Sequence, residues 1–373
     1  MRILTIFGTR PEAIKMAPLV IELNSIKGID ARVCVTGQHR EMLDQVLKLF
    51  EIKPDYDLNI MRPNQTLQSV TTDIISSLSP ILEDFKPDSV LVHGDTTTTF
   101  AASIAAFYKQ INIVHIEAGL RTGDIYSPWP EEGNRKLTSI IAHLHFAPTI
   151  SSYENLLKEN IPSDKIFITG NTVIDALLIA IEKLNNCETL RRSIEEKFSF
   201  LDKKRKSVLI TAHRRENFGD GIKNICNAIK KLADEYKDFD FIYPIHMNPK
   251  IQVPVKAALT GIPNIHLIEP LDYLPFIYIM SRATIILTDS GGIQEEAPTL
   301  GKPVLVMRDT TERPEAVAAG TVRLVGTNTE TIIKEFKKII DDEDEYNRMA
   351  KAKNPYGDGK SRKIIVSKII GDQ

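Results

Sequence analysis

Carboxylate side chains follow apolar runs in the first half of the chain, where they could take part in proton transfer. Asp95 follows the run SVLVHG, Glu117 ends the run INIVHIE, and Glu131 lies in the segment SPWPEEGNR. A carboxylate at the end of a buried strand is partly desolvated, which raises its pKa toward the range that suits acid–base catalysis. Glu117 is therefore a candidate acid or base, and Asp95 could be one as well. In the third segment Glu131, Glu132 and Asn134 are all candidates, and the segment alone does not choose among them.

Each of these carboxylates also has a structural interpretation. Asp95 is well placed as the N-cap of the helix expected to follow it. Glu117 could form a buried ion pair with Arg121, and Glu131 could form a helix ion pair with Arg135, four residues later. The residues alone leave both kinds of role open.

The segment GTRPEAIK follows the first apolar run and brings cations to the start of a helix. Gly8 permits a tight turn, and Pro11 suits the first helical turn. Arg10 and Lys15 near that helix N-terminus could bind phosphate, although they could also be ordinary surface cations. The segment is not G-x-G-x-x-G, so it gives no support to a dinucleotide cofactor.

A second group of cations lies in the other half of the chain. The segment TAHRREN places His213 beside Arg214 and Arg215 after an apolar run. A single histidine is more often structural, but this cluster favours phosphate binding. Arg313 lies in a later loop, RDTTERPEA, which also follows an apolar run.

The segment LTDSGGIQEEAPTLG combines a turn that suits an anion with two acidic residues. Backbone amides around Ser290, Gly291 and Gly292 could hold a diphosphate at the start of a helix. Glu295 and Glu296 point about 100° apart on a helix, so they cannot both face one ligand. One of them could accept hydrogen bonds from ribose hydroxyls, and the other is expected to be solvated or structural.

The apolar runs before these residues form two series that alternate with helical patterns. Strands that are buried on both faces and joined by helices indicate parallel sheets. The expected strands are 3–7, 30–36, 89–94, 111–117, 144–149 and 165–170 in the first series, and 207–213, 240–246, 265–270, 284–289 and 302–307 in the second. The sequence therefore predicts an α/β fold with two doubly wound, Rossmann-like domains of parallel sheet.

The domain boundary is expected near Gly170. Residues 1–170 then form the first domain and residues 171–354 the second. The final helical pattern, SRKIIVSKIIG, is expected to pack back on the first domain, so residues 355–373 are assigned to it. Ligands in such folds bind beyond the carboxyl ends of the strands, where the polar residues described above lie.

Composition narrows the class of protein. The chain has 373 residues and a formal net charge of −2, which argues against a nucleic-acid-binding protein. Its cysteines, Cys34, Cys187 and Cys226, show no disulfide or metal spacing, which is typical of reduced thiols in a cytoplasmic protein. No apolar run approaches the ~20 residues of a membrane helix. The histidines show no zinc-binding spacing, so we expect no metal.

Nine segments together resemble the non-hydrolysing UDP-N-acetylglucosamine 2-epimerases. They are FGTRPEAIKMAPL, VHGDTTTTFA, EAGLRTGD, SPWPEEGNR, TGNTVIDAL, TAHRREN, LTDSGGIQEEAPTLGKPVLV, TERPEAVAAGT and NPYGDG. The resemblance implies a GT-B-like fold with the active site in the cleft between the domains. It implies reversible conversion of UDP-GlcNAc to UDP-ManNAc by a cytoplasmic homodimer, without NAD or another cofactor and without a metal. The product would supply ManNAc-type sugars for surface polysaccharides or related glycans.

The resemblance also implies roles for individual residues. The residues that match the proton-transfer positions are Asp95, Glu117 and Glu131, with His213 beside them. Glu296 matches the ribose-binding glutamate, and Phe276 is expected beside the uracil. The residues that match the diphosphate-binding positions are Arg10, Lys15, His213, Ser290, Gly291, Gly292 and Arg313.

Some members of this family bind a second UDP-GlcNAc molecule as an activator. The residues that fit such a site are Gln38, His39, Arg214 and His246. Glu41 stands where the family usually has a glutamine, and Asn64 where it has an arginine. A lost cation and a gained anion weaken the binding of a diphosphate, so we expect activation by substrate to be impaired.

Three other functions share part of this pattern. A GT-B glycosyltransferase would hold UDP in the same way, and a hydrolysing 2-epimerase would release free ManNAc. A nucleotide-sugar sensor would bind without turnover. The glycosyltransferase and the sensor do not explain the carboxylates of the first domain, whereas the hydrolysing epimerase stays open as an alternative.

Overall fold

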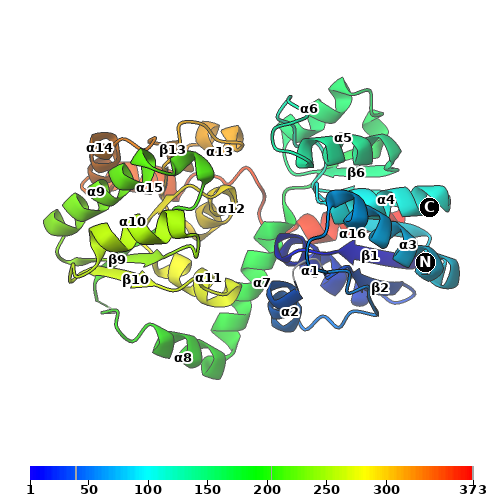
Figure 1. The fold of residues 1–373 in the computed structure, drawn as a ribbon, viewed down its shortest axis with the longest axis horizontal. Helices are drawn as coiled ribbons and strands as arrows, with labels where there is room; N and C mark the ends of the chain where they lie inside the picture. The colour runs from blue at the N-terminus through cyan, green and yellow to red at the C-terminus, as the bar shows by residue number, and fades with distance from the viewer. Residues whose placement is uncertain (38–39, 203, 372–373) are drawn as a thin grey trace. The chain divides into compact units, whose positions relative to one another are not determined.

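The chain folds into two compact units in the computed structural model, which describes residues 1–37, 40–202 and 204–371. The first unit comprises Met1–Ala176 and Tyr356–Gln373, and the second comprises Leu177–Pro355. Each unit has its own parallel sheet with helices packed against it (Figure 1). The predicted α/β class with two parallel-sheet domains is confirmed.

The first unit is built on a seven-stranded parallel sheet in the order β3-β2-β1-β4-β5-β6-β7. Its strands are β1 (Arg2–Phe7), β2 (Asp30–Val35), β3 (Tyr56–Asp57), β4 (Ser89–His93), β5 (Asn112–Ile116), β6 (Leu144–Ala147) and β7 (Ile166–Ile168). Its helices are α1 (Arg10–Asn24), α2 (Arg40–Leu49), α3 (Leu67–Phe85), α4 (Thr97–Tyr108), α5 (Glu131–Ile141), α6 (Ile150–Lys158), the 3₁₀ turn η1 (Ser163–Lys165) and the C-terminal α16 (Ser361–Gly371). Helix α7 (Thr172–Asn186) begins in this unit and continues into the second.

The second unit repeats the same plan with six strands in the order β10-β9-β8-β11-β12-β13. Its strands are β8 (Lys206–Thr211), β9 (Phe239–Pro244), β10 (Ile265–Ile268), β11 (Ile285–Thr288), β12 (Val304–Val306) and β13 (Val322–Leu324). Its other elements are α8 (Glu188–Lys197), η2 (Arg215–Asn217), α9 (Asp220–Glu235), α10 (Pro249–Leu259), α11 (Tyr273–Arg282), α12 (Gly291–Glu296), η3 (Ala297–Leu300), α13 (Pro314–Ala318), α14 (Thr329–Ile340) and α15 (Glu343–Ala350).

The strand order places a topological switch point in each sheet. In the first unit β1 lies between β2 and β4, and in the second β8 lies between β9 and β11. At such a point the connections leave the sheet in opposite directions, and the loops after the two central strands border a crevice. The loops after β1, β4, β8 and β11 are therefore where a ligand is expected.

Both sheets are held by apolar strands covered by helices. Leu4 of β1 and Val90 of β4 share one core with Ile74 and Leu78 of α3. In the second unit, strand residues share a core with α9, α10 and α14. Central strands such as β4 and β11 are buried along their whole length, because helices cover both faces of a doubly wound sheet.

Strands β3 and β13 were not predicted from the sequence. Strand β3 has two residues and β13 has three, and both lie at an end of their sheet. Each contains a charged residue, Asp57 in β3 and Arg323 in β13, so neither segment forms the apolar run that marks a strand.

The C-terminal segment returns to the first unit beside Gly170. The backbone of Asn171 donates to the Tyr356 carbonyl at 2.7 Å, and α16 packs against α1. Gly170 has φ +81, and a Cβ atom there would lie 2.9 Å from that carbonyl. A side chain at this position would therefore separate the segment from the end of β7.

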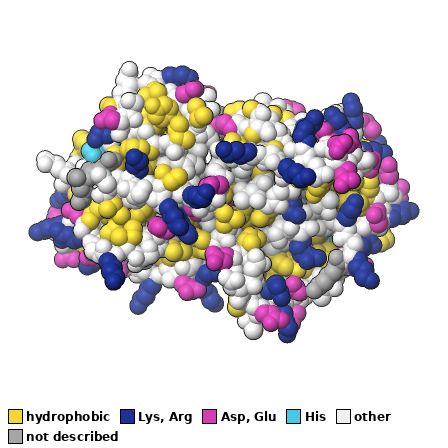
Figure 2. All heavy atoms as spheres, turned by 180° about the vertical axis from the view of Figure 1, so that it is seen from behind, with side chains coloured by type: hydrophobic (Ala, Val, Ile, Leu, Met, Phe, Trp, Pro, Cys, Tyr) yellow, Lys and Arg dark blue, Asp and Glu magenta, His cyan; other side chains and the backbone are white. Residues whose placement is uncertain are grey.

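Charged side chains of both signs are interspersed over the face shown in Figure 2, and no basic patch dominates it. This distribution agrees with the net charge of −2. Among the described residues, none of the helices is both long and apolar enough to cross a membrane.

Candidate active site

Buried Glu12 joins the two loops at the switch point of the first unit. Its Oε2 accepts from the backbone of Gly8 at 3.0 Å and of Thr9 at 2.7 Å, and its Oε1 accepts from the Thr96 hydroxyl at 2.6 Å. Thr9 and Glu12 also form the capping box of α1, a local pattern that fixes the start of a helix. Burial raises the pKa of Glu12, while these hydrogen bonds lower it. One side chain thus holds the loop after β1 against the loop after β4.

Asp95 lies in the loop after β4, but it is not the helix N-cap that the sequence suggested. The N-cap of α4 is Thr96, whose hydroxyl accepts from the Thr99 backbone at 3.1 Å. The Asp95 carboxylate instead accepts from Arg135, through Nε at 2.9 Å and Nη2 at 2.6 Å. Asn134 donates to the Asp95 carbonyl at 2.9 Å. Helix α5 therefore fixes the position of this carboxylate.

The ion pair between Glu131 and Arg135, which the spacing offered as an alternative to a functional role, does not form in the structure. Arg135 pairs with Asp95 and, at 2.9 Å, with the fully buried Glu132. Glu131 is the first residue of α5, and its Oε2 atom is buried without a hydrogen-bond partner among the described residues. An unpaired buried oxygen is unfavourable in a carboxylate. This atom is therefore suited to contact a ligand.

Glu117 occupies a strained position directly after β5. Its φ of 58° lies in the left-handed region, which costs a residue with a side chain roughly 1–3 kcal/mol. Its Oε2 forms an ion pair with Lys15 and accepts from Asn171 at 2.6 Å. The alternative pairing with Arg121 is wrong, because Arg121 pairs with Glu159 at 2.6 Å.

Asp95 and Glu117 lie at the same edge of the sheet. Strands β4 and β5 are adjacent and in register, with His93 opposite Ile116, and each carboxylate follows the end of its strand. Arg10 begins α1 at the neighbouring strand, and its guanidinium makes no hydrogen bond or ion pair with the described residues. Lys15 lies in the same helix and forms an ion pair with Glu117, and its role in phosphate binding stays a prediction.

His213 is fixed at the switch point of the second unit by Asp289. The fully buried Oδ2 of Asp289 accepts from the backbone of His213 and of Arg214, both at 2.8 Å, and from Asn217 Nδ2 at 3.0 Å. Its Oδ1 lies 3.2 Å from His213 Nδ1. Burial lowers the pKa of His213, the Asp289 charge raises it, and Arg214 lowers it. The residue after β11 thus holds the loop after β8, as Glu12 joins the corresponding loops of the first unit.

Cationic groups gather beside the glycines after β11. A Cβ atom on Gly291 would lie 3.6 Å from the Arg313 guanidinium carbon and 3.7 Å from Arg214 Nη2. Arg313 also pairs with buried Glu295. Ser290 precedes the two glycines and is the N-cap of α12. The absence of a side chain at Gly291 leaves room for an anion beside two guanidinium groups.

The two adjacent glutamates have different environments, as the helical geometry requires. Glu295 is 2 % exposed and is a structural partner of Arg313, not a solvated residue. Glu296 is partly exposed, and its Oε2 accepts from the Tyr273 hydroxyl at 3.1 Å. A Cβ atom on Gly292 would lie 3.7 Å from Glu296 Oε1, so this carboxylate lies beside the glycines. Phe276 is half-buried on α11, the helix that carries Tyr273.

Comparison with known proteins gives one consistent result. The family model described as "UDP-N-acetylglucosamine 2-epimerase" matches residues 21–370. The chain is 62% identical over 370 residues to the UDP-N-acetylglucosamine 2-epimerase of Neisseria meningitidis serogroup A, with 99% of each chain covered. The chain belongs to this family.

Further relatives agree. The chain is 58% identical over 361 residues to the UDP-N-acetylglucosamine 2-epimerase of Escherichia coli K12, with 97% of this chain and 96% of the relative covered. The crystal structure of the Neisseria meningitidis enzyme bound to UDP-GlcNAc superposes with a TM-score of 0.92 at 61% identity, and each chain is fully covered. The resemblance stated from the motifs is confirmed, and with it the class of enzyme, an isomerase with a GT-B-like fold.

Half of the residues expected for an activator site in this epimerase lie outside the described residues, namely Gln38 and His39. His246 is exposed, and its ring stacks on His213 with 5.7 Å between ring centroids. Arg214 lies beside Gly291, as described above. Glu41 and Asn64 are both exposed. The activator site stays a prediction.

Four residues of this epimerase that shape the site were not singled out from the sequence: Glu12, Arg135 as the partner of Asp95, Asn171 and Asp289. Glu12 had a local signal, because Thr-x-x-Glu is the pattern of a capping box. The other residues had none, since their partners are distant in the sequence or depend on the shape of a loop.

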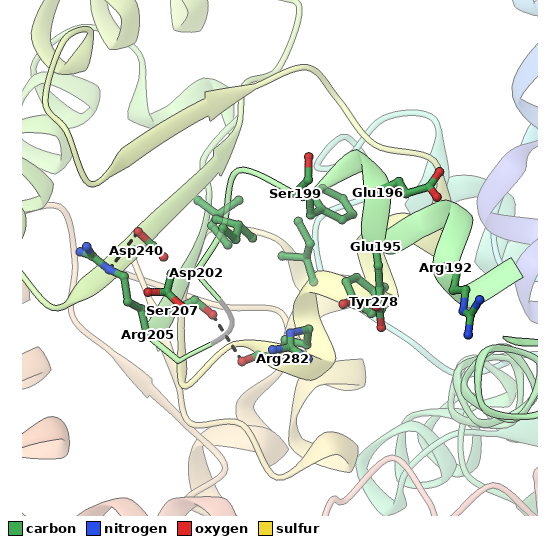
Figure 3. A pocket seen from close by; sticks show the side chains of 14 residues that line it. Arg192, Glu195, Glu196, Ser199, Asp202, Arg205, Ser207, Asp240, Tyr278 and Arg282 are labelled. Atoms are coloured by element: carbon green, nitrogen blue, oxygen red, sulfur yellow. Dashed lines mark hydrogen bonds and ion pairs between the residues drawn. The ribbon is translucent and has the colours of Figure 1, made fainter. Parts of the chain in front are cut away.

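A pocket of about 380 Å³ in the second unit lies at the other edge of the sheet (Figure 3). It is lined by Ser207 near the start of β8, Asp240 near the start of β9, and Arg282 at the end of α11. Ligands of doubly wound folds bind at the carboxyl ends of the strands. This pocket is therefore separate from the residues considered above.

Proposed function

We propose that the protein interconverts UDP-GlcNAc and UDP-ManNAc by eliminating UDP and adding it back. The proposal rests above all on two arrangements in this member of the family. A strained carboxylate, Glu117, follows β5 and is held by Lys15 and Asn171. Two guanidinium groups lie beside Gly291, which follows β11. The first arrangement suits proton transfer and the second suits a departing diphosphate.

The reaction needs both arrangements because the hydrogen on carbon 2 is not acidic in the resting sugar. It becomes removable as the bond from carbon 1 to UDP breaks and positive charge develops. A carboxylate accepts that proton, UDP leaves with the bonding electrons, and the products are 2-acetamidoglucal and UDP. Addition of UDP to carbon 1, with protonation of carbon 2 on the opposite face, gives the epimer. Two faces require at least two acid–base groups.

The candidate groups are Asp95, Glu117 and Glu131, with His213 beside the diphosphate. Asp95 is fixed by Arg135, and Glu131 has a buried oxygen without a partner among the described residues. Arg10, Arg313 and the amides near Gly291 are proposed to bind the diphosphate. Glu296 is proposed to accept hydrogen bonds from the ribose, and Phe276 to contact the uracil.

Deuterated water distinguishes this reaction from its alternatives. Incubation with UDP-GlcNAc, followed by NMR of the sugar, should give UDP-ManNAc that carries deuterium at carbon 2. Free ManNAc would indicate a hydrolysing epimerase, and unchanged UDP-GlcNAc would indicate transfer to an acceptor or simple binding. Either of these results would contradict the proposal.

The roles of the carboxylates are tested by matched variants. Glu117→Gln should lose most turnover while still binding UDP, and the same is expected of Asp95→Asn, Glu131→Gln and His213→Asn. Glu159→Gln is the control, because Glu159 is a paired glutamate of the same unit that contacts Arg121. A near-normal rate in any of the first four variants would remove that residue from the mechanism.

We also propose a homodimer, with the second copy covering apolar residues of α4 and α5. These two helices pack against each other and expose large hydrophobic side chains, namely Phe107, Tyr108, Leu137 and Ile140. Ile140 is 74 % exposed, which is unfavourable unless another surface covers it. Sedimentation should show a dimer for the unmodified chain and a monomer for Ile140→Glu. A monomeric unmodified chain would refute this part.

Two further parts of the proposal concern the cellular setting. The three cysteines are free, and Cys34 and Cys226 are buried, as expected of a protein in a reducing cytoplasm. UDP-ManNAc is a precursor of ManNAc-type sugars, so the product is proposed to supply glycan synthesis. Detection of the protein outside the cytoplasm would contradict the first part.

A further inference from the structure

His93 is a buried histidine to which the proposed reaction gives no role. It is the last residue of β4, two positions before Asp95, and it is 4 % exposed. Its Nε2 atom is buried and makes no hydrogen bond with the described residues. A buried ring nitrogen without a partner is unfavourable, and such atoms in native proteins need an explanation.

The unpaired nitrogen faces the carboxylate proposed to transfer protons. His93 Nε2 lies 3.8 Å from Glu117 Oε2. The same oxygen is contacted by Lys15 from α1 and by Asn171, which immediately precedes α7. Side chains from β4, from α1 and from the residue before α7 therefore converge on one atom of Glu117.

The other oxygen of Glu117 has a different neighbour. A Cβ atom placed on Gly94 would lie 3.6 Å from Glu117 Oε1, so this oxygen lies over a residue that has no side chain. The two oxygens are therefore not equivalent: Oε2 is next to the three polar side chains, and Oε1 is next to a glycine.

We infer that His93 is a positioning residue for Glu117, and that it acts through Oε2. A small movement of the carboxylate brings Nε2 and Oε2 within hydrogen-bond distance, so that an Nε2–H group donates to Oε2. Together with Lys15 and Asn171, this donor fixes the rotation of the carboxylate, and it directs the second oxygen to the substrate. The inference rests on the proposed role of Glu117 in proton transfer.

The charge of His93 fits this role. Burial lowers its pKa to about 4, the negative charge of Glu117 raises it, and Lys15 lowers it. Asp95 also acts on it and raises the pKa. The ring is therefore neutral near pH 7 and can donate a hydrogen bond without adding a second cation beside Lys15.

The test compares variants that keep or remove a donor at the Nε2 position. Gln places its amide nitrogen where histidine has Nε2, whereas Leu fills similar space without a donor. His93→Leu should lower kcat about 10- to 100-fold, as expected when a reacting group is misplaced by about 1 Å. The KM for UDP-GlcNAc should stay within about twofold of the unmodified value. His93→Gln should recover most of the lost rate.

Two readouts separate positioning from a general loss of structure. A donor to Oε2 favours the charged carboxylate, so its removal raises the pKa of Glu117. The acidic limb of the kcat profile should then move up by about one pH unit in His93→Leu. UDP-GlcNAc labelled with deuterium at carbon 2 should also show a larger isotope effect, because proton transfer becomes slower.

His145 provides the matched control. It is also a buried strand histidine of the first unit, with an unpartnered Nδ1 among the described residues and a pKa lowered to about 4 by burial. His145→Leu should reduce thermal stability without moving the pH profile. Equal losses of kcat in His93→Leu, His93→Gln and His145→Leu would overturn the inference, and so would an unchanged kcat in His93→Leu.

If His93→Leu does not fold, His93→Asn takes its place, because Asn carries its amide nitrogen at the Nδ1 position and leaves Oε2 without a donor. The inference then requires His93→Gln to be faster than His93→Asn, and equal rates would overturn it. Failure of the proposed function is distinguishable from failure of the inference. In the first case the unmodified protein itself puts no deuterium into UDP-ManNAc.

Discussion

Substitution of Asp289 by Asn should disable His213 while preserving the shape of the loop. Asp289 Oδ2 accepts hydrogen bonds from the backbone of His213 and of Arg214 and from Asn217. These donors select the amide oxygen for that position in the variant. The amide nitrogen must then take the place of Oδ1, 3.2 Å from His213 Nδ1. A donor now faces a nitrogen that faced a carboxylate.

The exchange has two effects of estimable size. Hydrogen bonds to a charged acceptor contribute about 1.5–3 kcal/mol and neutral ones about 0.5–1.5 kcal/mol, so three weakened bonds should lower the unfolding free energy by about 3 kcal/mol. The amide nitrogen donates to His213 Nδ1 and so favours the His213 tautomer that carries its proton on Nε2. In that tautomer His213 Nε2 cannot accept a proton from the substrate. We expect kcat to fall about 100-fold or more, within the range assigned to general acid–base groups.

The assay is kcat against pH, together with thermal unfolding and UDP binding. The negative charge of Asp289 raises the pKa of His213. In Asp289→Asn that charge is absent, so the part of the kcat–pH curve that reports the titration of His213 should move to lower pH. UDP binding should weaken far less than kcat falls, because the Arg214 and Arg313 guanidinium groups beside Gly291 are retained.

Asp240→Asn is the control for this experiment. Asp240 is another buried aspartate of the second unit and lies 3.0 Å from a histidine, His266. It lies near the amino end of β9, away from the switch-point loops. Its substitution should cost stability but not activity. The reasoning would be refuted if Asp289→Asn kept kcat within about threefold of the unmodified value, or if Asp240→Asn lost as much activity.

Three more outcomes follow from the structure. Burial lowers the pKa values of His93, His115 and His145 from 6.5 to about 4, 3 and 4. Below pH 6.5 the unfolded chain therefore binds protons that the folded protein does not, so the free energy of unfolding falls as the pH falls from 6.5 toward 4. Thermal melts should show a loss of about 4 kcal/mol between pH 7 and pH 5.5, and an unchanged melting temperature over this window would contradict it. Gly291→Ala should raise the KM for UDP-GlcNAc about tenfold or more, because the added Cβ occupies the space beside the guanidinium groups. The melting temperature should change little, because this Cβ makes only ordinary contacts, the nearest at 3.6 Å. Equal KM values for the variant and the unmodified protein would show that no anion binds there. Initial rates should depend hyperbolically on UDP-GlcNAc, because Glu41 and Asn64 replace a glutamine and an arginine of the expected activator site, and a sigmoidal curve would refute this.

The sequence by itself determined the fold class, the family and most residues at the strand ends. Apolar runs with helical patterns between them specify parallel strands, because such strands are buried on both faces. Local signals also specified the start of α1, where Thr9 and Glu12 form a capping box within one helical turn. Position after a strand was enough to mark Asp95, Glu117, His213 and Ser290 as candidates, since ligands of such folds bind at that edge.

Only the tertiary structure decided which side chains are partners. Lys15 and Glu117 are separated by 102 positions, Asp95 and Arg135 by 40, and His213 and Asp289 by 76. The pair of His213 and Asp289 forms because the strand order places β8 beside β11. The other two pairs form because α1 and α5 pack where β5 and β4 end, and no local pattern encodes that order or that packing. For the same reason two ion pairs that the spacing allowed, Glu117 with Arg121 and Glu131 with Arg135, do not form. Short-range spacing shows which charges could meet, but the packing of α1 and α5 on the sheet decides which charges do meet.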